Sequence, residues 1–328
     1  MLLLNRATIR EFFTLKDSIE AVRVAFSLFS QGRVEVPLRT QISAATSQGV
    51  FLCMPAFCEQ ERASCVKALN MFKNNVEKGL DSINAWVLVM DTDTGVIDGL
   101  IDGSYLTQLR TGAASGVAFD LLARKDCAKG ALIGAGGQAA TQLEAMLVVR
   151  VLSEVQVFDA NHERARTLVA TMSRELASYG TKITAVATSD EAVEGADLVI
   201  TVTPSTRPVF DGDRLKAGAT VSCVGSYQPQ MQEMPPRALV RATKLYFDSE
   251  EAVLSEAGDI LIPLADGTIT RDKFTGDLGR VINGELVGRE NDEEIIIFKT
   301  VGIAAQDAIT AQRILARARA EGRGLEWS

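Results

Sequence analysis

The chain has 328 residues, of which 47% are hydrophobic and 23% charged, a composition typical of folded globular proteins and too apolar for a disordered chain. At roughly 100–200 residues per domain, this length favours two domains. Thirty-four Lys and Arg residues against 42 Asp and Glu give a net charge of -8, and no basic run exceeds two residues, so we expect no nucleic-acid partner.

The first third of the chain predicts a region of mixed helix and strand. The short apolar run within residues 1–6 is expected to form a first strand, because it has no basic segment before it and no small-residue cleavage site, both of which a signal peptide would need. Residues 9–29 have apolar positions at helical spacing and predict one amphipathic helix. Apolar runs at 50–54 and 85–90 predict buried strands, and the Asp/Thr/Gly turn after the second predicts a hairpin with 96–97. Since strand follows strand, we expect an antiparallel or mixed sheet.

From about residue 115 the pattern alternates between strand and helix. Helices are predicted over 113–123, 139–149, about 162–179 and 303–320, with a short one opening at Asp190. Between them lie apolar strands at 131–133, 155–159, 183–186, 197–202, 220–224, 244–247 and 294–298. Continuous Val/Ile runs that alternate with helices favour a parallel sheet covered on both faces. No stretch of about 18 uncharged apolar residues occurs, so we expect no membrane partner.

A glycine-rich turn lies between the first strand of this region and its helix. The segment 134–139 fits the pattern G-x-G-x-x-A. Gly134 allows a tight turn, Gly136 lets the backbone approach a pyrophosphate, and the small Ala139 permits close packing of helix on strand. Free N–H groups at the helix start would meet the phosphates. The turn therefore predicts a dinucleotide site that includes Gly134, Gly136, Gly137 and Gln138.

Asp159 ends the second strand of the region, where a carboxylate can accept hydrogen bonds from the ribose hydroxyls of the dinucleotide. A 2′-phosphate at this place would meet the carboxylate, and residues 160–162 supply no Arg to neutralise it. We therefore expect NAD(H) in preference to NADP(H) as the cofactor. The alternative is that Asp159 only caps the following helix.

The five cysteines are odd in number and scattered through the chain, which favours free thiols and a reducing, cytoplasmic location. Three of them are close in sequence, but their spacings match no zinc pattern, and the single histidine, His162, is remote from them. We expect no metal site.

Several motifs in order along the chain resemble those of the ornithine cyclodeaminase/mu-crystallin family of NAD(P)-dependent proteins. They are residues 36–40, Lys67, 106–114, the glycine turn, 203–205, 224–233, 256–260, and 298–302 with Asp307. The segment Leu-Thr-x2-Arg-Thr-Gly-Ala-Ala at 106–114 is the most specific, because a generic Rossmann protein has no reason to carry it. The resemblance implies an α/β homodimer with a doubly wound Rossmann domain at 116–302. Residues 1–115 with 303–328 would form an α+β domain for substrate binding and dimerisation.

The resemblance also implies the residues of the site. Three basic residues of the family hold the substrate α-carboxylate, and they fall here on Arg39, Lys67 and Arg110. An Arg fork and an ammonium group suit a small carboxylate, although surface salt bridges are the alternative for each. The positions that the family uses around the cofactor fall on Ser82, Arg110, Thr111, Thr203, Val224, Gly225, Ser226 and Thr300.

Two positions depart from the family pattern. Ornithine cyclodeaminases and a related alanine dehydrogenase have an Asp, directed at the substrate amine, where this chain has Tyr227. A tyrosine of pKa about 10 is a poor base at neutral pH, which argues against ornithine cyclisation and is compatible with reduction. The second departure is Lys73, in a segment that is usually Phe-Pro-Gly-Asn. It would either hold a second substrate carboxylate or lie on the solvated surface.

The sequence thus predicts an enzyme, an NADH-dependent reductase that converts a small α-imino acid to an L-amino acid. The substrate is iminosuccinate, giving aspartate, or a cyclic ketimine such as pyrroline-2-carboxylate. Lys67 is the candidate proton donor to an unprotonated imine. The alternatives are a lyase of the ornithine cyclodeaminase type with bound NAD, and a non-catalytic ligand-binding protein.

Overall fold

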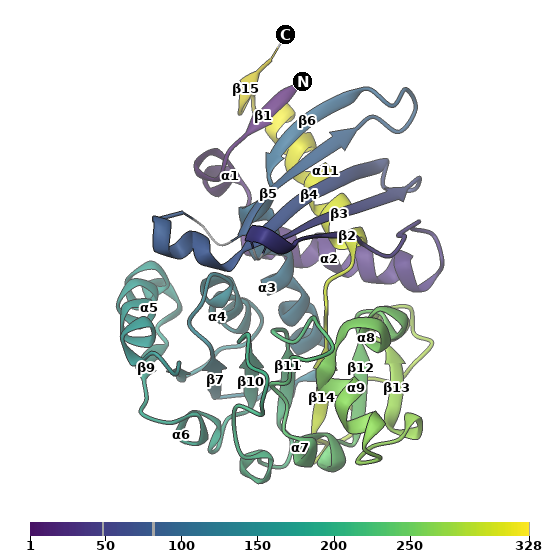
Figure 1. Cartoon of the computed structure of the whole chain (residues 1–328). Helices are drawn as coiled ribbons and strands as arrows, with labels where there is room; N and C mark the ends of the chain where they lie inside the picture. Colours follow the sequence, from purple (N-terminus) through teal and green to yellow (C-terminus); the bar gives the residue numbers. More distant parts are fainter. Residues whose placement is uncertain (48, 81–82, 328) are drawn as a thin grey trace. The chain divides into compact units, whose positions relative to one another are not determined.

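The computed structural model describes residues 1–47, 49–80 and 83–327, and the chain divides into two compact units (Figure 1). Unit 1 comprises Met1–Arg110 and Ile303–Ser328, and unit 2 comprises Thr111–Gly302. The division falls within helix α3 (Gly103–Leu122), so the first segment of unit 1 ends at Arg110 and not at residue 115. In the described ranges, no helix is both long enough and apolar enough to cross a membrane.

Unit 1 is built on a mixed sheet of seven strands within the described residues. Its strand order is β15-β1-β6-β5-β4-β3-β2. The β1–β6 pair is parallel and the other pairs are antiparallel, which confirms the predicted mixed sheet and the predicted hairpin of β5 and β6. The strands are β1 (Leu2–Leu4), β2 (Thr40–Ala44), β3 (Gly49–Cys58), β4 (Ala63–Phe72), β5 (Ile83–Met90), β6 (Ile97–Asp102) and β15 (Leu325–Glu326).

Helices cover one face of this sheet. Along β3 the side chains alternate, with Leu52 and Met54 buried and Phe51 and Cys53 exposed, as expected where only one face is covered. The C-terminal helix α11 (Ala304–Ala320) packs on β3, β4 and β5 and on α2. The end of the chain therefore returns to complete the unit that its beginning forms, as Figure 1 shows by the yellow helix among the purple and blue strands.

The N-terminal helical segment consists of two helices, so the prediction of one helix over 9–29 is wrong. Helix α1 (Arg6–Phe12) has Phe13 as its C-cap, and α2 (Leu15–Ser30) begins after Thr14. The Thr14 side chain accepts from the Asp17 N–H, and the Asp17 carboxylate accepts from the Thr14 N–H at 2.8 Å. This capping box satisfies backbone donors that a continuous helix would have bonded internally, so the chain starts a new helix at Thr14.

Unit 2 has a doubly wound Rossmann sheet, which confirms the predicted fold class. Its eight described strands are all parallel, in the order β13-β12-β14-β11-β10-β7-β8-β9. The order reverses between β7 and β10, and ligands of such sheets bind beyond the carboxyl ends of the strands at this point. The strands are β7 (Lys129–Ile133), β8 (Glu154–Phe158), β9 (Lys182–Ala185), β10 (Leu198–Thr201), β11 (Thr220–Cys223), β12 (Lys244–Phe247), β13 (Phe274–Asp277) and β14 (Ile296–Lys299).

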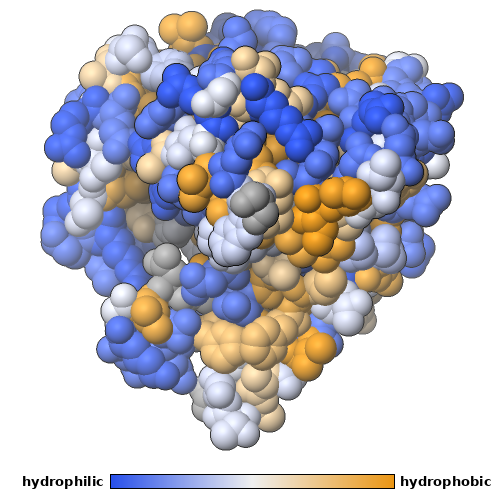
Figure 2. Space-filling view, turned by 90° about the horizontal axis from the view of Figure 1, so that it is seen from above, coloured by the Kyte–Doolittle hydropathy of each residue, from blue (hydrophilic) through white to orange (hydrophobic). Residues whose placement is uncertain are grey.

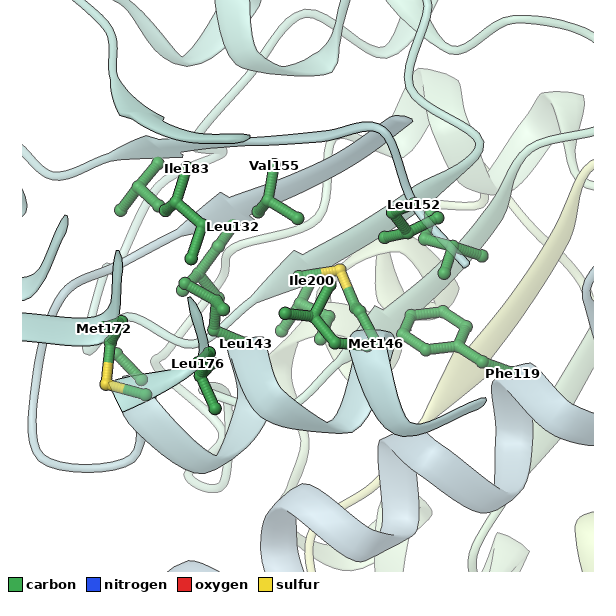
Figure 3. Packing of buried hydrophobic residues seen from close by; sticks show 14 of the residues in the cluster. Phe119, Leu132, Leu143, Met146, Leu152, Val155, Met172, Leu176, Ile183 and Ile200 are labelled. Atoms are coloured by element: carbon green, nitrogen blue, oxygen red, sulfur yellow. The ribbon is translucent and has the colours of Figure 1, made fainter. Parts of the chain in front are cut away.

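Helices α4 (Ala139–Val149), α5 (His162–Glu175) and α6 (Ser189–Val193) each follow one of the strands β7, β8 and β9. The later helices are α7 (Pro236–Arg241), α8 (Glu250–Glu256), α9 (Gly258–Ala265) and α10 (Leu278–Ile282). Figure 3 shows the apolar core on this side of the sheet, where Leu143 and Met146 of α4 pack with Leu132, Ile200 and Phe119. This packing fixes the start of α4, and with it the glycine turn.

Helix α3 begins at Gly103, so the predicted start at residue 113 is ten positions too late. Gly103, Thr107, Thr111 and Gly112 are poor helix formers, and this is why propensity misplaces the start. The glycines are required by packing. A Cβ at Gly112 would lie 2.6 Å from the Thr141 carbonyl oxygen of α4, so the helices approach closely there.

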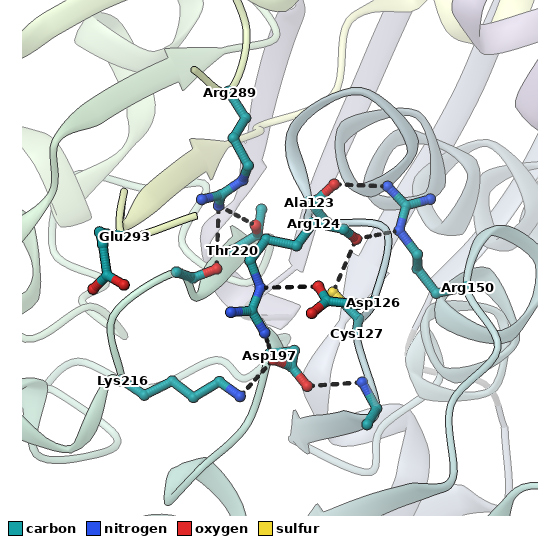
Figure 4. A network of polar contacts seen from close by, with 12 residues as sticks. Ala123, Arg124, Asp126, Cys127, Arg150, Asp197, Lys216, Thr220, Arg289 and Glu293 are labelled. Carbon is teal, nitrogen blue, oxygen red and sulfur yellow. Dashed lines mark hydrogen bonds and ion pairs between the residues drawn. The ribbon is translucent and has the colours of Figure 1, made fainter. Parts of the chain in front are cut away.

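A charged network lies at the amino ends of β7 and β10 (Figure 4). The Asp197 carboxylate accepts from the backbone N–H groups of Ala128 at 2.8 Å and Lys129 at 3.0 Å, and it pairs with Arg124 and Lys216. Arg150 donates to several carbonyl oxygens at the end of α3. The network anchors the end of the sheet that is opposite to the glycine turn.

Candidate active site

A buried charge cluster in unit 1 contains two of the three predicted carboxylate-binding residues. Lys67 lies on β4, on the face of the sheet that α11 covers, and its side chain is fully buried. The Lys67 Nζ donates to Asp307 Oδ2 at 2.8 Å. Asp307 stands in the first turn of α11, where the partial positive charge of the helix start favours a carboxylate.

Arg110 reaches the same carboxylate from α3. Its Nε donates to Asp307 Oδ1 at 3.3 Å, and its Nη1 donates to Gln306 Oε1 at 3.4 Å. Gln306 Oε1 also accepts from the Ile303 N–H at 3.0 Å, so the amide belongs to the capping of α11. Asp307 therefore bridges Lys67 and Arg110, one with each carboxylate oxygen.

Two cations around one carboxylate leave an excess positive charge in the cluster. Burial lowers the pKa of Lys67 to about 8, Asp307 opposes this shift, and the charges of Arg110 and Arg39 add to it. Near pH 7 the Lys67 ammonium therefore releases a proton more easily than an ordinary lysine does. An excess of positive charge with a labile proton suits an anionic ligand that takes up a proton.

The remaining residues predicted for the substrate are less fully described. Arg39 is half-buried just before β2, close enough to Lys67 to act on its pKa. Lys73 opens the 3₁₀ helix η2 (Lys73–Lys78), and its side chain lies outside the described part of the chain, as does Ser82 entirely. The roles predicted for these three residues stay predictions.

The glycine turn of unit 2 has the open geometry that a dinucleotide needs. Gly134 has φ 109°, and a Cβ there would lie 2.7 Å from the Val202 carbonyl oxygen, so only glycine fits. A Cβ at Gly136 or Gly137 would meet nothing within 4 Å. Gln138 precedes α4, and its buried Oε1 has no hydrogen-bond partner among the described residues. The turn thus offers open space at a helix start, where backbone N–H groups can donate to a pyrophosphate.

Asp159 lies directly after β8, next to this turn. Its Oδ2 accepts from the Ala135 N–H at 2.7 Å, and its Oδ1 accepts from the Asn161 N–H at 2.8 Å. The cap of helix α5 is Asn161, whose side chain accepts from Glu163 and Arg164. Asp159 is therefore no direct helix cap, and its carboxylate stays beside the turn where a ribose would lie.

The loops after β10 and β11 meet at Glu233, a residue to which the sequence assigned no role. Glu233 Oε1 accepts from the Thr203 N–H at 2.5 Å, and Oε2 accepts from the Gly225 N–H at 2.6 Å. A Cβ at Gly225 would lie 2.1 Å from the Thr203 carbonyl oxygen. Burial and the neighbouring Asp259 raise the pKa of Glu233, and Lys299 opposes them.

Four other residues predicted to contact the cofactor make hydrogen bonds within the protein. The Ser226 hydroxyl is buried and donates to the Met231 carbonyl oxygen, and the Thr111 carbonyl accepts from Gln142 Nε2. The Val224 N–H donates to the Thr201 carbonyl oxygen. The Thr300 hydroxyl donates to Asp248 Oδ2 at 2.6 Å. Their contacts with a cofactor stay predictions.

Sequence reasoning missed the buried carboxylates that hold these groups: Asp307, Glu233, Asp259 and Asp248. The family motifs could have indicated three of them, since Asp307, Glu233 and Asp259 lie within the motifs that carry the resemblance. Asp259 is fully buried and accepts from the Glu233 N–H.

The fold and these groups define a two-unit α/β protein with a Rossmann sheet and a separate buried cation cluster. The profile of the ornithine cyclodeaminase/mu-crystallin family matches residues 1–322, so the chain belongs to this family. The Δ1-pyrroline-2-carboxylate reductase of Bacillus cereus is 36% identical over 324 residues, which cover 99% of this chain and 98% of that protein.

Solved structures agree with this assignment. The Thermococcus litoralis Δ1-pyrroline-2-carboxylate reductase in complex with NADH and L-proline is 38% identical, with a TM-score of 0.95 and 100% of both chains covered. An archaeal alanine dehydrogenase dimer with bound NAD is 29% identical, with a TM-score of 0.91, over 100% of this chain and 99% of that chain.

Proposed function

We propose that this protein reduces a cyclic α-imino acid, Δ1-pyrroline-2-carboxylate or its six-membered homologue, to the L-amino acid with NADH. The observation that carries the proposal is the buried Lys67–Asp307–Arg110 cluster, which joins a carboxylate-binding cation to a lysine with a lowered pKa. The similarity to pyrroline-2-carboxylate reductases over the whole chain supports the cyclic substrate over iminosuccinate.

The reaction adds a hydride to the imine carbon and a proton to the imine nitrogen. When NADH is bound, it supplies the hydride. Gly134, Gly136 and Gly137 would hold its pyrophosphate and Asp159 its ribose. In this proposal, residues of unit 1 bind the substrate and deliver the proton.

Arg110 binds and orients the substrate in this proposal. Asp307 and Gln306 use its Nε and Nη1, and this fixes the plane of the guanidinium. We assign Nη2 to the substrate carboxylate, with Arg39 as the second cation. A carboxylate held between the fixed Nη2 of Arg110 and the charge of Arg39 gives the imine one orientation, and positioning of this kind lowers a barrier by several kcal/mol.

Lys67 delivers the proton. Its ammonium is buried, so a proton given to the imine nitrogen is not lost to water, and its pKa near 8 keeps it charged at neutral pH. Asp307 accepts from Lys67 and holds the Nζ at a fixed place through the exchange. A protonated imine needs no such donor, and in that case the Lys67 charge helps only to hold the carboxylate.

A panel of substrates tests the proposal. NADH oxidation is measured with the two cyclic ketimines, and with oxaloacetate, pyruvate and glyoxylate each in the presence of ammonia, with NADPH alongside. We expect fast NADH oxidation with a cyclic ketimine and a much slower rate with NADPH. Lys67→Met should abolish turnover and leave NADH affinity unchanged. No oxidation with any substrate, together with ammonia release from ornithine and catalytic NAD, would instead support the lyase.

We further propose that the protein is a homodimer, formed through the uncovered face of the unit 1 sheet. Ile42, Phe51 and Trp86 are large apolar residues on this face, 63%, 46% and 48% exposed. The pairing of β2 with β3 places Ile42 opposite Phe51, so the two form one patch. Apolar residues also adjoin one another on the surface seen in Figure 2. A contiguous apolar face is typical of an interface, and the similarity to a dimeric alanine dehydrogenase supports a second copy as its partner.

All five cysteines are free thiols, and four of them are buried. This supports our proposal of a reducing, cytoplasmic location.

A further inference from the structure

We propose that Glu233 is a positioning residue that sets the affinity for the nicotinamide cofactor by fixing the loops after β10 and β11. It does so as the end of a buried chain of charges that starts at Lys299. The inference rests on the proposed function, because the two loops bear on catalysis only if unit 2 binds NADH.

The Glu233 carboxylate joins two loops that are separate in sequence. One oxygen accepts from the Thr203 N–H, and the other accepts from the Gly225 N–H and, at 3.3 Å, from the Thr201 hydroxyl. The side chain is fully buried, so water does not compete for these donors. Both carboxyl oxygens accept from backbone N–H groups, and this favours the ionised form against the burial that raises the pKa of Glu233. Hydrogen bonds to an ionised acceptor are about twice as strong as neutral ones.

The position of Glu233 is fixed in turn by a second buried carboxylate, that of Asp259. Asp259 Oδ1 accepts from the Glu233 N–H at 2.6 Å and from the Met234 N–H at 2.8 Å. The Lys299 Nζ lies 3.1 Å from Asp259 Oδ2 and donates to the Cys223 carbonyl oxygen at 3.3 Å. Lys299 is the last residue of β14, and Cys223 is the last of β11. The chain of charges therefore ties Glu233 to the carboxyl ends of two sheet strands.

Position in the sheet distinguishes a cofactor role from stability alone. Thr203 follows β10, the neighbour of the strand β7 that leads into the glycine turn, and Gly225 follows β11, one strand further along the sheet. Both lie at the end of the sheet where ligands of this fold bind. A Cβ built at Gly134 of that turn would lie 2.9 Å from Thr203 Cγ2, so the Thr203 loop forms one side of the turn. A shift of that loop would therefore change the space that the turn leaves open.

Asp197 provides a matched control within the same unit. It is buried, as Glu233 is, and its carboxylate also accepts from two backbone N–H groups. It lies directly before β10, at the opposite end of the strand that leads to Thr203. Loss of either carboxylate should destabilise unit 2, but only loss of Glu233 should disturb the cofactor loops.

The experiment compares Glu233→Gln with Asp197→Asn. The Kd for NADH is measured by fluorescence titration at a temperature well below the melting point of each protein. In Glu233→Gln, one N–H group faces an amide NH2 instead of an acceptor, so we expect the Kd to rise about 10- to 100-fold. For Asp197→Asn we expect a lower Tm and a Kd within about threefold of the parent value.

A second variant keeps the test decisive if Glu233→Gln does not fold. Asp259→Asn retains the Glu233 side chain and weakens only its support, so we expect a smaller rise in the Kd, about three- to tenfold. An unchanged Kd in the Glu233 and Asp259 variants, or an equal rise in Asp197→Asn, would overturn the inference alone. A parent protein that binds neither NADH nor NAD would overturn the proposed function and the inference together.

Discussion

At the scale of single residues, the central feature is a lysine whose charge has no access to water. Removal of an ammonium from water costs several kcal/mol unless a partner compensates, and Asp307 is that partner. Arg110 shares the same carboxylate, so the compensation is incomplete, and the pKa of Lys67 falls to about 8. The charge that we propose holds the substrate is therefore also a source of protons in the physiological range.

The pH dependence of the reaction should report this group. Lys67 is protonated below pH 8 and neutral above it, so kcat/KM for the ketimine should fall as the pH rises through about 8. An arginine at position 67 keeps its charge at all these pH values, so the pH profile of Lys67→Arg should lack this descending limb, and its overall rate should be lower. The measurement is the pH profile of kcat/KM for both proteins at saturating NADH. A limb near pH 8 that persists in Lys67→Arg would assign it to another group.

Asp307 should control where that limb lies. Its charge raises the pKa of Lys67, so Asp307→Asn should lower that pKa and move the limb below pH 8. The same change leaves Lys67 and Arg110 buried without a counter-charge, and we expect a loss of about 3 kcal/mol in the free energy of unfolding at pH 7. Urea unfolding and the pH profile together check both effects. Asp17→Asn, at the half-buried start of α2, is the control for the pH profile, which should match that of the parent.

At the scale of elements, glycines in two loops should respond oppositely to the same substitution. A Cβ at Gly136 meets no atom within 4 Å, so Gly136→Ala should keep the Tm of the free protein and raise the Kd for NADH at least tenfold. A Cβ at Gly225 would lie 2.4 Å from Glu233 Oε2, so Gly225→Ala should lower the Tm by several degrees. Thermal unfolding with and without NADH separates the two. Equal Tm values for both variants would contradict the packing at Gly225.

The elements that could be predicted are those whose pattern is local. Strands of unit 2 are continuous apolar runs, and most of them lie where the runs are. The sequence also contains a signal for the break between α1 and α2, because Thr14 and Asp17 have the spacing of a capping box. The apolar periodicity continues across 9–29, and it favours one helix instead. The early start of α3 could not be predicted from local sequence. Its glycines allow close packing against Ala85 and Thr141, and neither residue is a sequence neighbour of the helix start.

At the scale of the whole molecule, the candidate site depends on residues that are far apart along the chain. Lys67 and Asp307 are 240 positions apart, and no periodicity or spacing joins them. The family resemblance predicted the lysine and the arginine, but their shared carboxylate became evident only once α11 was seen to return to the β3–β5 sheet. The same is true of Glu233, whose bonds to Thr203 and Gly225 require two loops to meet.

The dimer proposal makes a prediction at this same scale. If the uncovered sheet face joins two copies, the protein in solution should have twice the 35.3 kDa of one chain by light scattering. Trp86→Glu combined with Phe51→Glu places two charges in the patch, where burial would be costly, and should shift the mass to that of one chain. Val151→Glu is the matched control, since Val151 is 93% exposed and lies in unit 2, and it should leave the mass unchanged. A dimer that survives both charges on the sheet would place the contact on another face, and a parent of single-chain mass would exclude the dimer.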